Sequence, residues 1–421
     1  MTKKVRKAEK AKETLEIEDF LSIKYINWEV RQFNIISGDM AVGKSLCIKI
    51  MNFFEDIIPD LLIAPYDQFI KNLEKDYLFN NLAEKFKDIF YISQLDKNQS
   101  PPFKINYTFS FGEKNFAITI KSSDKTDVTV ESISLENLLK EWLNYSEKRF
   151  INVPEKVTYD GFKEMKHYFY NKLQKKFGGH FPVKAAFIPA SRAALTLSTD
   201  YTDHYLRKYN AFTDNLPLRR SRNQKVIETI LKAKINIEDT IYLDSADGRR
   251  VPLAKASSGQ QEVAFFLMHL DRLGNYSYTY GKTQSLFIEE PSAYLSPQDE
   301  KDLIEFIVEI YNRQKNTEIP IRFFITTYSL YIINSLNNML KKGDLIKNYK
   351  EKIDKINSRM NIPPLDADEV SAYYIYNDKG EGKNILIKNQ IQANEITKIS
   401  DAIKKNDSEL SKLKAELSRS S

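Results

Sequence analysis

One run of eight residues has the spacing of a phosphate-binding loop. Gly38-Asp39-Met40-Ala41-Val42-Gly43-Lys44-Ser45 fits the pattern G-x-x-x-x-G-K-[ST] completely. The glycines let main-chain N–H groups turn inward around phosphates, at the start of a helix whose dipole favours anions. Lys44 would then reach the β- and γ-phosphates, and the Ser45 hydroxyl would bind Mg²⁺. We therefore predict that ATP and Mg²⁺ are bound by Gly38, Asp39, Met40, Ala41, Val42, Gly43, Lys44, Ser45 and Leu46.

Two adjacent carboxylates end an apolar run further along the chain. Glu289 and Glu290 follow Phe287-Ile288 and precede Pro291. At the carboxyl edge of a parallel sheet, such residues lie beside a phosphate-binding loop. Glu289 would hold Mg²⁺ directly or through water, and Glu290 would polarise the attacking water as general base. By itself, an acidic pair after a strand is also typical of a solvated loop.

A third motif lies a short distance upstream of these carboxylates. It consists of Ser257, Ser258, Gly259, Gln260 and Gln261. A Ser-Gly pair that opens a helix supplies N–H groups and a hydroxyl for an anion. One nucleotide has one phosphate-binding loop, so a second anion site implies that a phosphate is held from two sides. The alternative is an ordinary helix N-cap.

The elements that must position these motifs predict an α/β fold with a mixed, largely parallel sheet. Phe33–Ile36 reads as a strand that leads into the glycine loop, and residues 46–54 read as the helix after it. The strands 285–288 and 322–326 are each followed by a helical stretch, which indicates a parallel sheet with crossover helices. Residues 103–133 alternate with period two and predict an antiparallel β lobe.

We expect five segments along the chain. They are a disordered basic lead-in (1–13), a first ATPase lobe with the glycine loop and antiparallel sheet (14–150), a helical insertion with a sheet strand at 185–190 (151–240), a second ATPase lobe (241–340), and a C-terminal helix, hairpin and terminal helix (341–421).

Composition narrows the class of protein. The chain has 421 residues, 42% of them hydrophobic, so it can bury a substantial core. Its single cysteine, Cys47, excludes a disulfide framework. A net charge of +6 from 63 basic and 57 acidic residues is too balanced to indicate nucleic-acid binding by itself. No apolar run approaches the roughly 20 residues that cross a bilayer. We expect a cytoplasmic protein.

The three motifs, in this order, resemble the ABC-ATPase superfamily. Gly38–Ser45 is similar to Walker A, Ser257–Gln261 to the signature motif, Ser285–Glu290 to Walker B and Ala293–Ser296 to the D-loop. The resemblance implies an ABC-ATPase P-loop fold. It also implies that Ser258 and Gly259 of one copy contact the γ-phosphate held by Lys44 of another. ATP would then be sandwiched in a homodimer, with higher rings also compatible.

Within that superfamily, the chain is most similar to the soluble OLD and SMC-type branch. Phe187–Arg192, Glu289-Glu290-Pro291 and Thr326–Tyr331 carry this resemblance. It extends to ATPase subunits of anti-phage systems such as PARIS and Septu, which imply a separate TOPRIM or HNH nuclease and a phage-encoded trigger or DNA mimic as partners. Three functions remain open: control of such a nuclease, a DNA-repair or chromosome ATPase that acts directly on DNA, and a nucleotide-gated scaffold with little hydrolysis.

The sequence departs from the family pattern at two positions, Tyr328 and Glu289. Tyr328 occupies the place where the family usually has a histidine that senses the γ-phosphate, which favours slow hydrolysis. Glu289 replaces the commoner aspartate. Gln94 is our candidate for the Q-loop residue that contacts the metal. Aromatic and basic residues also alternate in Tyr201–Arg222, which suits either nucleic acid or an amphipathic helix followed by a solvated loop.

Overall fold

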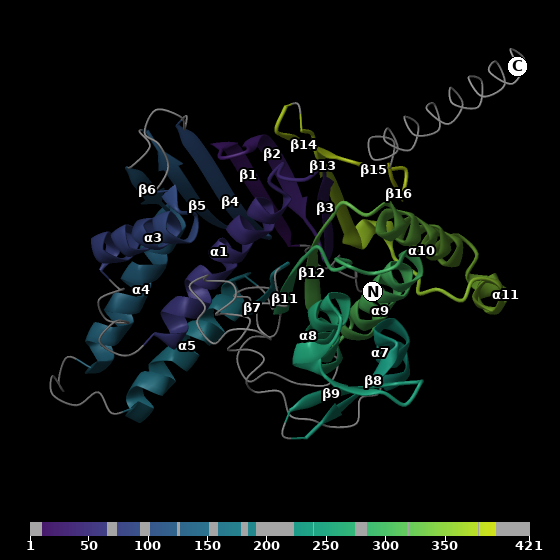
Figure 1. The fold of residues 1–421 in the computed structure, drawn as a ribbon. Helices are drawn as coiled ribbons and strands as arrows, with labels where there is room; N and C mark the ends of the chain where they lie inside the picture. The colour runs from purple at the N-terminus through teal and green to yellow at the C-terminus, as the bar shows by residue number, and fades with distance from the viewer. Residues whose placement is uncertain are drawn as a thin grey trace, which may run out of the picture.

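An 11-stranded sheet runs through the molecule (Figure 1). The computed structural model describes residues 11–64, 74–92, 102–123, 127–150, 159–177, 184–190, 223–238, 240–273, 284–317, 320–377 and 379–392, and all structural statements below concern these residues. The strand order is β6-β5-β4-β1-β2-β14-β13-β3-β12-β11-β7. The predicted α/β fold with a mixed sheet is therefore confirmed.

One half of the sheet is the predicted antiparallel β lobe. It contains β1 (Lys12–Phe20), β2 (Ile23–Val30), β4 (Phe103–Phe111), β5 (Lys114–Ser122) and β6 (Val128–Glu131), each antiparallel to its neighbour. Buried and more exposed residues alternate along β4 and β5, so one face of the lobe packs on a core.

The other half is the parallel core that carries the sequence motifs. It contains β13 (Val370–Ile375), β3 (Phe33–Gly38), β12 (Ile321–Thr327), β11 (Gln284–Glu289) and β7 (Lys184–Ile188), and these five strands are parallel to one another. All residues of β3 and β12 are buried, as expected for strands covered on both faces. Because parallel strands end at the same edge, the segments after β3, β11 and β12 meet there.

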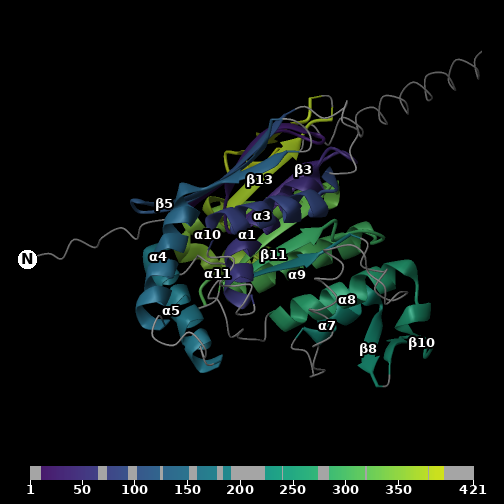
Figure 2. The same cartoon turned by 90° about the vertical axis from the view of Figure 1, so that its left-hand side faces the viewer.

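Helices cover both faces of the sheet (Figure 2). Ile36 belongs to the core cluster that contains α1 (Lys44–Ile63), α3 (Lys75–Ile89), α4 (Ile133–Phe150) and α5 (Tyr159–Phe177). The preceding residue, Ile35, belongs to the cluster that contains α7 (Gln224–Leu231), α8 (Ser258–Leu273), α9 (Pro297–Gln314) and α10 (Leu330–Asn348). None of the helices in the described part of the chain is long and apolar enough to span a bilayer.

The smaller elements complete the described chain. A three-stranded sheet of β8 (Ala233–Ile237), β9 (Ile241–Ser245) and β10 (Arg250–Pro252) leads through the short helix η3 (Leu253–Lys255) to α8. After α10 come η4 (Lys350–Lys352), α11 (Ile353–Arg359) and η5 (Ala367–Glu369). The predicted C-terminal hairpin is present, because β13 pairs antiparallel with β14 (Glu381–Asn384). A last pair is formed by β15 (Leu386–Ile387) and β16 (Gln390–Ile391).

The observed elements cross several of the segment boundaries that the sequence suggests. Strand β1 begins at Lys12, so the last residues of the expected lead-in are part of the sheet. The division at residue 150 separates α4 from α5, although Trp142 and Phe169 stack with ring centroids 4.4 Å apart. The division at 240 cuts the β8–β9 hairpin, and the division at 340 falls inside α10. The expected terminal helix, 397–418, lies outside the described residues.

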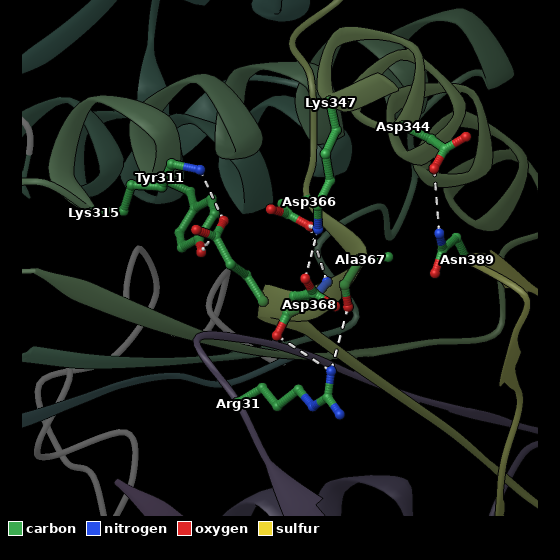
Figure 3. Close-up of polar contacts among 10 residues, drawn as sticks. Arg31, Tyr311, Lys315, Asp344, Lys347, Asp366, Ala367, Asp368 and Asn389 are labelled. Carbon is green, nitrogen blue, oxygen red and sulfur yellow. Dashed lines mark hydrogen bonds and ion pairs between the residues drawn. The ribbon is translucent and has the colours of Figure 1, made fainter. Parts of the chain in front are cut away.

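Short helix η5 anchors β13 beside the glycine-loop strand (Figure 3). Arg31, in the β2–β3 turn, donates to the main-chain oxygens of Ala367 and Asp368 at 3.4 and 3.2 Å. Glu369 accepts hydrogen bonds from Tyr311 and Lys315, both at 2.8 Å. These contacts fix the entry of the chain into β13, which pairs with β3 from Val370 onward.

A buried ionic cluster joins the antiparallel lobe to the parallel core. Arg322 of β12 pairs with Glu13 of β1 and Glu55 of α1. Its Nε donates to Ser285 Oγ at 3.2 Å, and Tyr107 of β4 donates to Glu13 at 2.7 Å. One guanidinium thus faces two carboxyl groups in the interior. Burial raises the pKa of Glu55 to about 8, against the opposing attraction of Arg322.

The cluster predicts a pH-dependent stability. Glu55 holds its proton to a higher pH in the folded chain than in the unfolded chain, so the free energy of unfolding should fall as pH rises to about 8 and level off above it. The slope should be at most about 1.4 kcal/mol per pH unit. Urea unfolding from about pH 5.5 to about pH 9 measures it, and Glu55→Gln should flatten the curve. The buried Cys47 thiol, whose pKa is raised to about 12, also contributes to the pH dependence. Its contribution is the same in the wild type and in the variant, so it cancels in the comparison of their slopes. An equal slope in the variant would contradict the assignment.

Candidate nucleotide site

The glycine loop adopts the left-handed backbone that a phosphate cradle needs. Ala41 and Gly43 have φ values of +63° and +104°, and Gly43 caps the N-terminus of α1. A Cβ on Gly43 would lie 2.7 Å from Ile23 Cγ1, so glycine is required for space as well as for φ. A Cβ on Gly38 would lie 2.7 Å from the Ile375 main-chain oxygen. No acidic residue occupies the first turn of α1, which leaves its positive end open to an anion.

Lys44 and Glu290 meet in this loop, as the sequence predicts. Lys44 Nζ donates to the main-chain oxygens of Gly38 and Asp39 at 2.9 and 2.6 Å, and lies 3.5 Å from Glu290 Oε1. The other oxygen of Glu290 accepts a hydrogen bond from the Tyr328 main-chain N–H at 3.3 Å. Burial raises the pKa of Glu290 although Lys44 opposes the shift, and a raised pKa makes its carboxylate a stronger base.

A pocket of about 740 Å³ opens beside this pair. The sequence-predicted residues that line it include Lys44, Ser45, Glu290 and Tyr328. The remaining predicted residues in its lining are Gly38, Asp39, Met40, Ala41, Gly43 and Leu46. Eight of the nine loop residues predicted from the sequence therefore line one cavity. The ninth, Val42, packs in the hydrophobic core.

Four further lining residues have no signal in the local sequence motifs. Leu21 and Ser22 come from the turn between β1 and β2, Ser37 is the penultimate residue of β3, and Tyr374 comes from β13. The Tyr374 hydroxyl donates to Asp39 Oδ1 at 3.3 Å, so the C-terminal hairpin contacts the loop directly. These residues are distant in sequence from the loop, and only the sheet order shows that they meet it.

Glu289, our predicted metal ligand, lies behind the pocket lining. It is buried, with Oε2 accepting from the Ala190 N–H at 3.1 Å and Oε1 lying 3.5 Å from Lys49 Nζ. Ala190 belongs to the Phe187–Arg192 strand end that the sequence analysis singles out. Ser45, another predicted metal ligand, lines the pocket. Gln94 lies outside the described residues, as does Tyr201–Arg222.

The Ser257–Gln261 motif forms the start of α8, and none of its five residues lines the pocket of its own chain. Ser257 and Gln260 form a reciprocal cap: Ser257 Oγ accepts from the Gln260 N–H at 3.3 Å, and Gln260 Oε1 accepts from the Ser257 N–H at 3.3 Å. Gln261 Nε2 donates to the Ala256 main-chain oxygen at 2.9 Å. Ser257 and Ser258 are exposed.

The rim of the site is unusually aromatic. Tyr328 is 57% exposed, and its ring centroid lies 6.0 Å from Lys44 Nζ. Tyr294, in the predicted D-loop, is 73% exposed and has a φ of +67°. Burial and the nearby Glu290 raise the pKa of Tyr328, so this residue is a neutral phenol at pH 7.

Residues 196–333 match the family model of an AAA ATPase domain. This stretch contains Ser257–Gln261, Glu289, Glu290 and Tyr328 but not the glycine loop. No curated protein matched the sequence.

Many solved structures resemble the chain at low sequence identity. The Smc head bound to the C-winged helix domain of ScpA is 12% identical, with a TM-score of 0.41 over 89% of this chain and 97% of that one. The SMC head domain from Thermotoga maritima is 9% identical, with a TM-score of 0.37 over 90% and 99%. The recombination mediator protein RecF-ATPrS of the RecFOR pathway is 11% identical, with a TM-score of 0.34 over 90% and 98%. These low scores give no support for a shared function.

The loop geometry predicts that Gly43→Ala weakens ATP binding about tenfold or more. The added methyl group would press on Ser22 and Ile23 and would hold the loop in a strained φ, which moves the N–H groups away from the phosphates. Isothermal titration with ATP measures the effect. Gly248→Ala is the matched control, because Gly248 also has a positive φ, +83°, but has no atom within 4 Å of the place that its added methyl group would take. Equal ATP affinity in the wild type, Gly43→Ala and Gly248→Ala would contradict the proposal that the loop backbone at Gly43 binds the phosphates.

Proposed function

We propose that this chain is an ATPase that binds ATP with Mg²⁺ in the pocket formed by the glycine loop. The proposal rests on the contact between Lys44 and Glu290, which are 246 positions apart in sequence. They meet at the N-terminus of α1, whose positive end is not neutralised by an acidic residue in its first turn. The residues fit a nucleoside triphosphate. Left-handed loop residues direct N–H groups inward, and the lysine is held within the loop.

Each residue has a defined task in the proposed reaction. Lys44 would exchange its contacts with loop carbonyl oxygens for phosphate oxygens, which leaves Glu290 to accept the proton of the attacking water. Ser45 and Glu289 are the candidate ligands for Mg²⁺, which would neutralise charge that develops on the γ-phosphate. Because Glu289 already contacts Ala190 and Lys49, we propose that it acts on the ion through water.

Removal of the metal tests this reading of the site. Phosphate release from ATP should require Mg²⁺ and stop when the ion is chelated, because the phosphates and Ser45 supply most of its ligands. Among the described residues, no group of three or more His, Cys, Asp or Glu side chains could hold an ion without them. Phosphate release that continues unchanged in excess chelator would contradict the proposed metal role.

We propose further that the Ser257–Gln261 motif completes the site of a second copy. Ser257 and Ser258 are exposed, the serine hydroxyls and N–H groups of the motif lie at a helix start, and none of its residues lines the pocket of its own chain. The aromatic rim formed by Tyr294 and Tyr328 supplies apolar area for such a contact. Mass measurement in solution should show a monomer without nucleotide and a dimer or larger ring with a slowly hydrolysed ATP analogue. A mass that is unchanged by nucleotide would contradict the proposal.

The wider role that we propose is control of a separate TOPRIM or HNH nuclease in defence against phage, with a phage-encoded trigger. This rests on the motif resemblance given above and on the nucleotide-gated assembly. Phage plating on cells that carry the chain with its neighbouring genes tests it. Protection should disappear with Lys44→Ala, and protection that survives that variant would rule out ATP-dependent control.

A further inference from the structure

The first turn of α9 contacts three segments: the predicted D-loop, the end of α7, and the segment that follows Tyr328. Its N-cap is Ser296, the last residue of the predicted D-loop, and two consecutive acidic residues, Asp299 and Glu300, follow in the first turn. The helix dipole stabilises carboxylates at this position. Their side chains contact different elements, so this one turn joins parts of the chain that are otherwise far apart.

Asp299 connects the D-loop to the C-terminal end of α7, which in turn contacts the Ser257–Gln261 motif. Its Oδ2 accepts from Ser296 Oγ at 2.7 Å, and its Oδ1 accepts from Lys232 Nζ at 2.5 Å. Lys232 directly follows Leu231, whose main-chain oxygen accepts from Gln260 Nε2 at 3.0 Å. Asp299 is buried although it carries charge, so its partners fix its position.

The D-loop also packs directly on the motif. A Cβ on Gly259 would lie 3.1 Å from the Tyr294 main-chain oxygen, so the backbones of the two segments are in close contact. The turn that leads into the D-loop begins at Glu290, whose main-chain oxygen accepts from the Ala293 N–H at 3.3 Å. The start of α8 therefore reaches the main chain of Glu290 through a short, hydrogen-bonded turn.

Glu300 is connected to the Glu290 carboxylate through Ser329 and Tyr328. Ser329 donates from Oγ to Glu300 Oε2. The same hydroxyl oxygen accepts from the N–H groups of Tyr331 and Ile332 at 3.2 and 3.3 Å and so caps α10. The neighbouring Tyr328 N–H is the group that holds Glu290 Oε2. Glu300 thus fixes the segment that orients the side chain of Glu290.

We propose that Glu300 and Asp299 are positioning residues that couple the Ser257–Gln261 motif to Glu290. When the start of α8 closes on a phosphate, its displacement reaches α9 through Asp299 and reaches the Glu290 carboxylate through Glu300, Ser329 and Tyr328. This inference rests on the proposed ATPase function. It adds that the motif of one chain, by closing on a partner's nucleotide, sets the geometry of the general base in its own pocket.

Steady-state kinetics of Glu300 variants test whether Glu300 positions the Glu290 carboxylate. Glu300→Ala should lower kcat about tenfold and leave ATP affinity within about twofold, because the lost hydrogen bond orients the base and does not touch the nucleotide. Glu300→Gln should restore most of kcat, since its amide oxygen also accepts from Ser329. Glu305→Ala is the matched control on the same helix, where Glu305 pairs with Lys301 at 2.9 Å. Should Glu300→Ala not give a cooperative melting transition, Glu300→Asp, with its shorter arm, replaces it with the same expectation.

A double-mutant comparison tests whether Asp299 and Glu300 act along one path. If the two acids act as one path, Asp299→Asn with Glu300→Ala should lose little more kcat than the worse single variant, whereas independent effects multiply. Multiplied losses, or a wild-type kcat in Glu300→Ala, would overturn the coupling. If Glu300→Ala retains the wild-type kcat while Lys44→Ala is inactive, the ATPase proposal stands and only the coupling fails. If the wild-type protein does not hydrolyse ATP, the ATPase proposal itself fails.

Discussion

Lys44→Ala should lower ATP hydrolysis about a hundred- to a thousandfold. The ammonium group is buried in the loop and is the cation that the structure places nearest to Glu290 among the described residues. Its loss removes the positive charge that would hold the β- and γ-phosphates, and it also leaves the Glu290 carboxylate without its ion-pair partner. Phosphate release at saturating ATP measures the rate, and nucleotide titration measures the accompanying loss of affinity.

A surface lysine provides the control for the charge change. Lys121→Ala on β5 removes a half-exposed lysine that pairs with Glu131 at 2.7 Å, far from the loop in the sheet order. It should hydrolyse ATP at the wild-type rate, because exposed ion pairs contribute little. Hydrolysis by Lys44→Ala at the rate of this control would mean that the phosphates bind elsewhere.

Glu290→Gln should separate binding from catalysis. The amide keeps the size of the carboxylate and can still accept a hydrogen bond from the Tyr328 N–H, but it cannot take a proton from water. We expect hydrolysis to fall about a hundred- to ten-thousandfold. ATP affinity should be retained or increased, because Lys44 no longer has a carboxylate that competes with the phosphates. Single-turnover phosphate release and equilibrium titration measure the two quantities.

Glu131→Gln, at an exposed site on β6, is the matched control and should be as active as wild type. A Glu290→Gln variant that hydrolyses ATP at the wild-type rate would remove Glu290 from the reaction. In that case any turnover would depend on another base.

The sequence predicted the local features of the site well, because their physical causes are local. The glycine loop needs left-handed backbone at fixed spacing and a helix start, and both can be read from Gly38–Ser45. The buried strands β3, β11 and β12 read as continuous apolar runs that end at functional residues. Parallel topology then requires those ends to meet at one edge.

Contacts between distant segments could not be predicted in the same way. Tyr374 reaches Asp39 only because β13 inserts beside β3, and no periodicity in residues 370–376 specifies that neighbour. The pairing of Arg322 with Glu13 gave no signal either, because a single charge at the start of an apolar strand also suits a solvated strand end. Contacts across the expected segment boundaries have the same origin: α4 packs on α5 across residue 150, and β8 pairs with β9 across residue 240.

Mixing two inactive variants tests most directly whether one copy completes the nucleotide site of another. Lys44→Ala removes the phosphate lysine, and Ser258→Arg blocks the exposed helix start. In a mixed pair, both defects fall in the same site and the other site has an intact Lys44 and an intact Ser258. The account predicts that each variant alone is inactive and that the mixture recovers a substantial part of the wild-type rate of phosphate release. A mixture as inactive as its components would contradict completion of the site by a second chain.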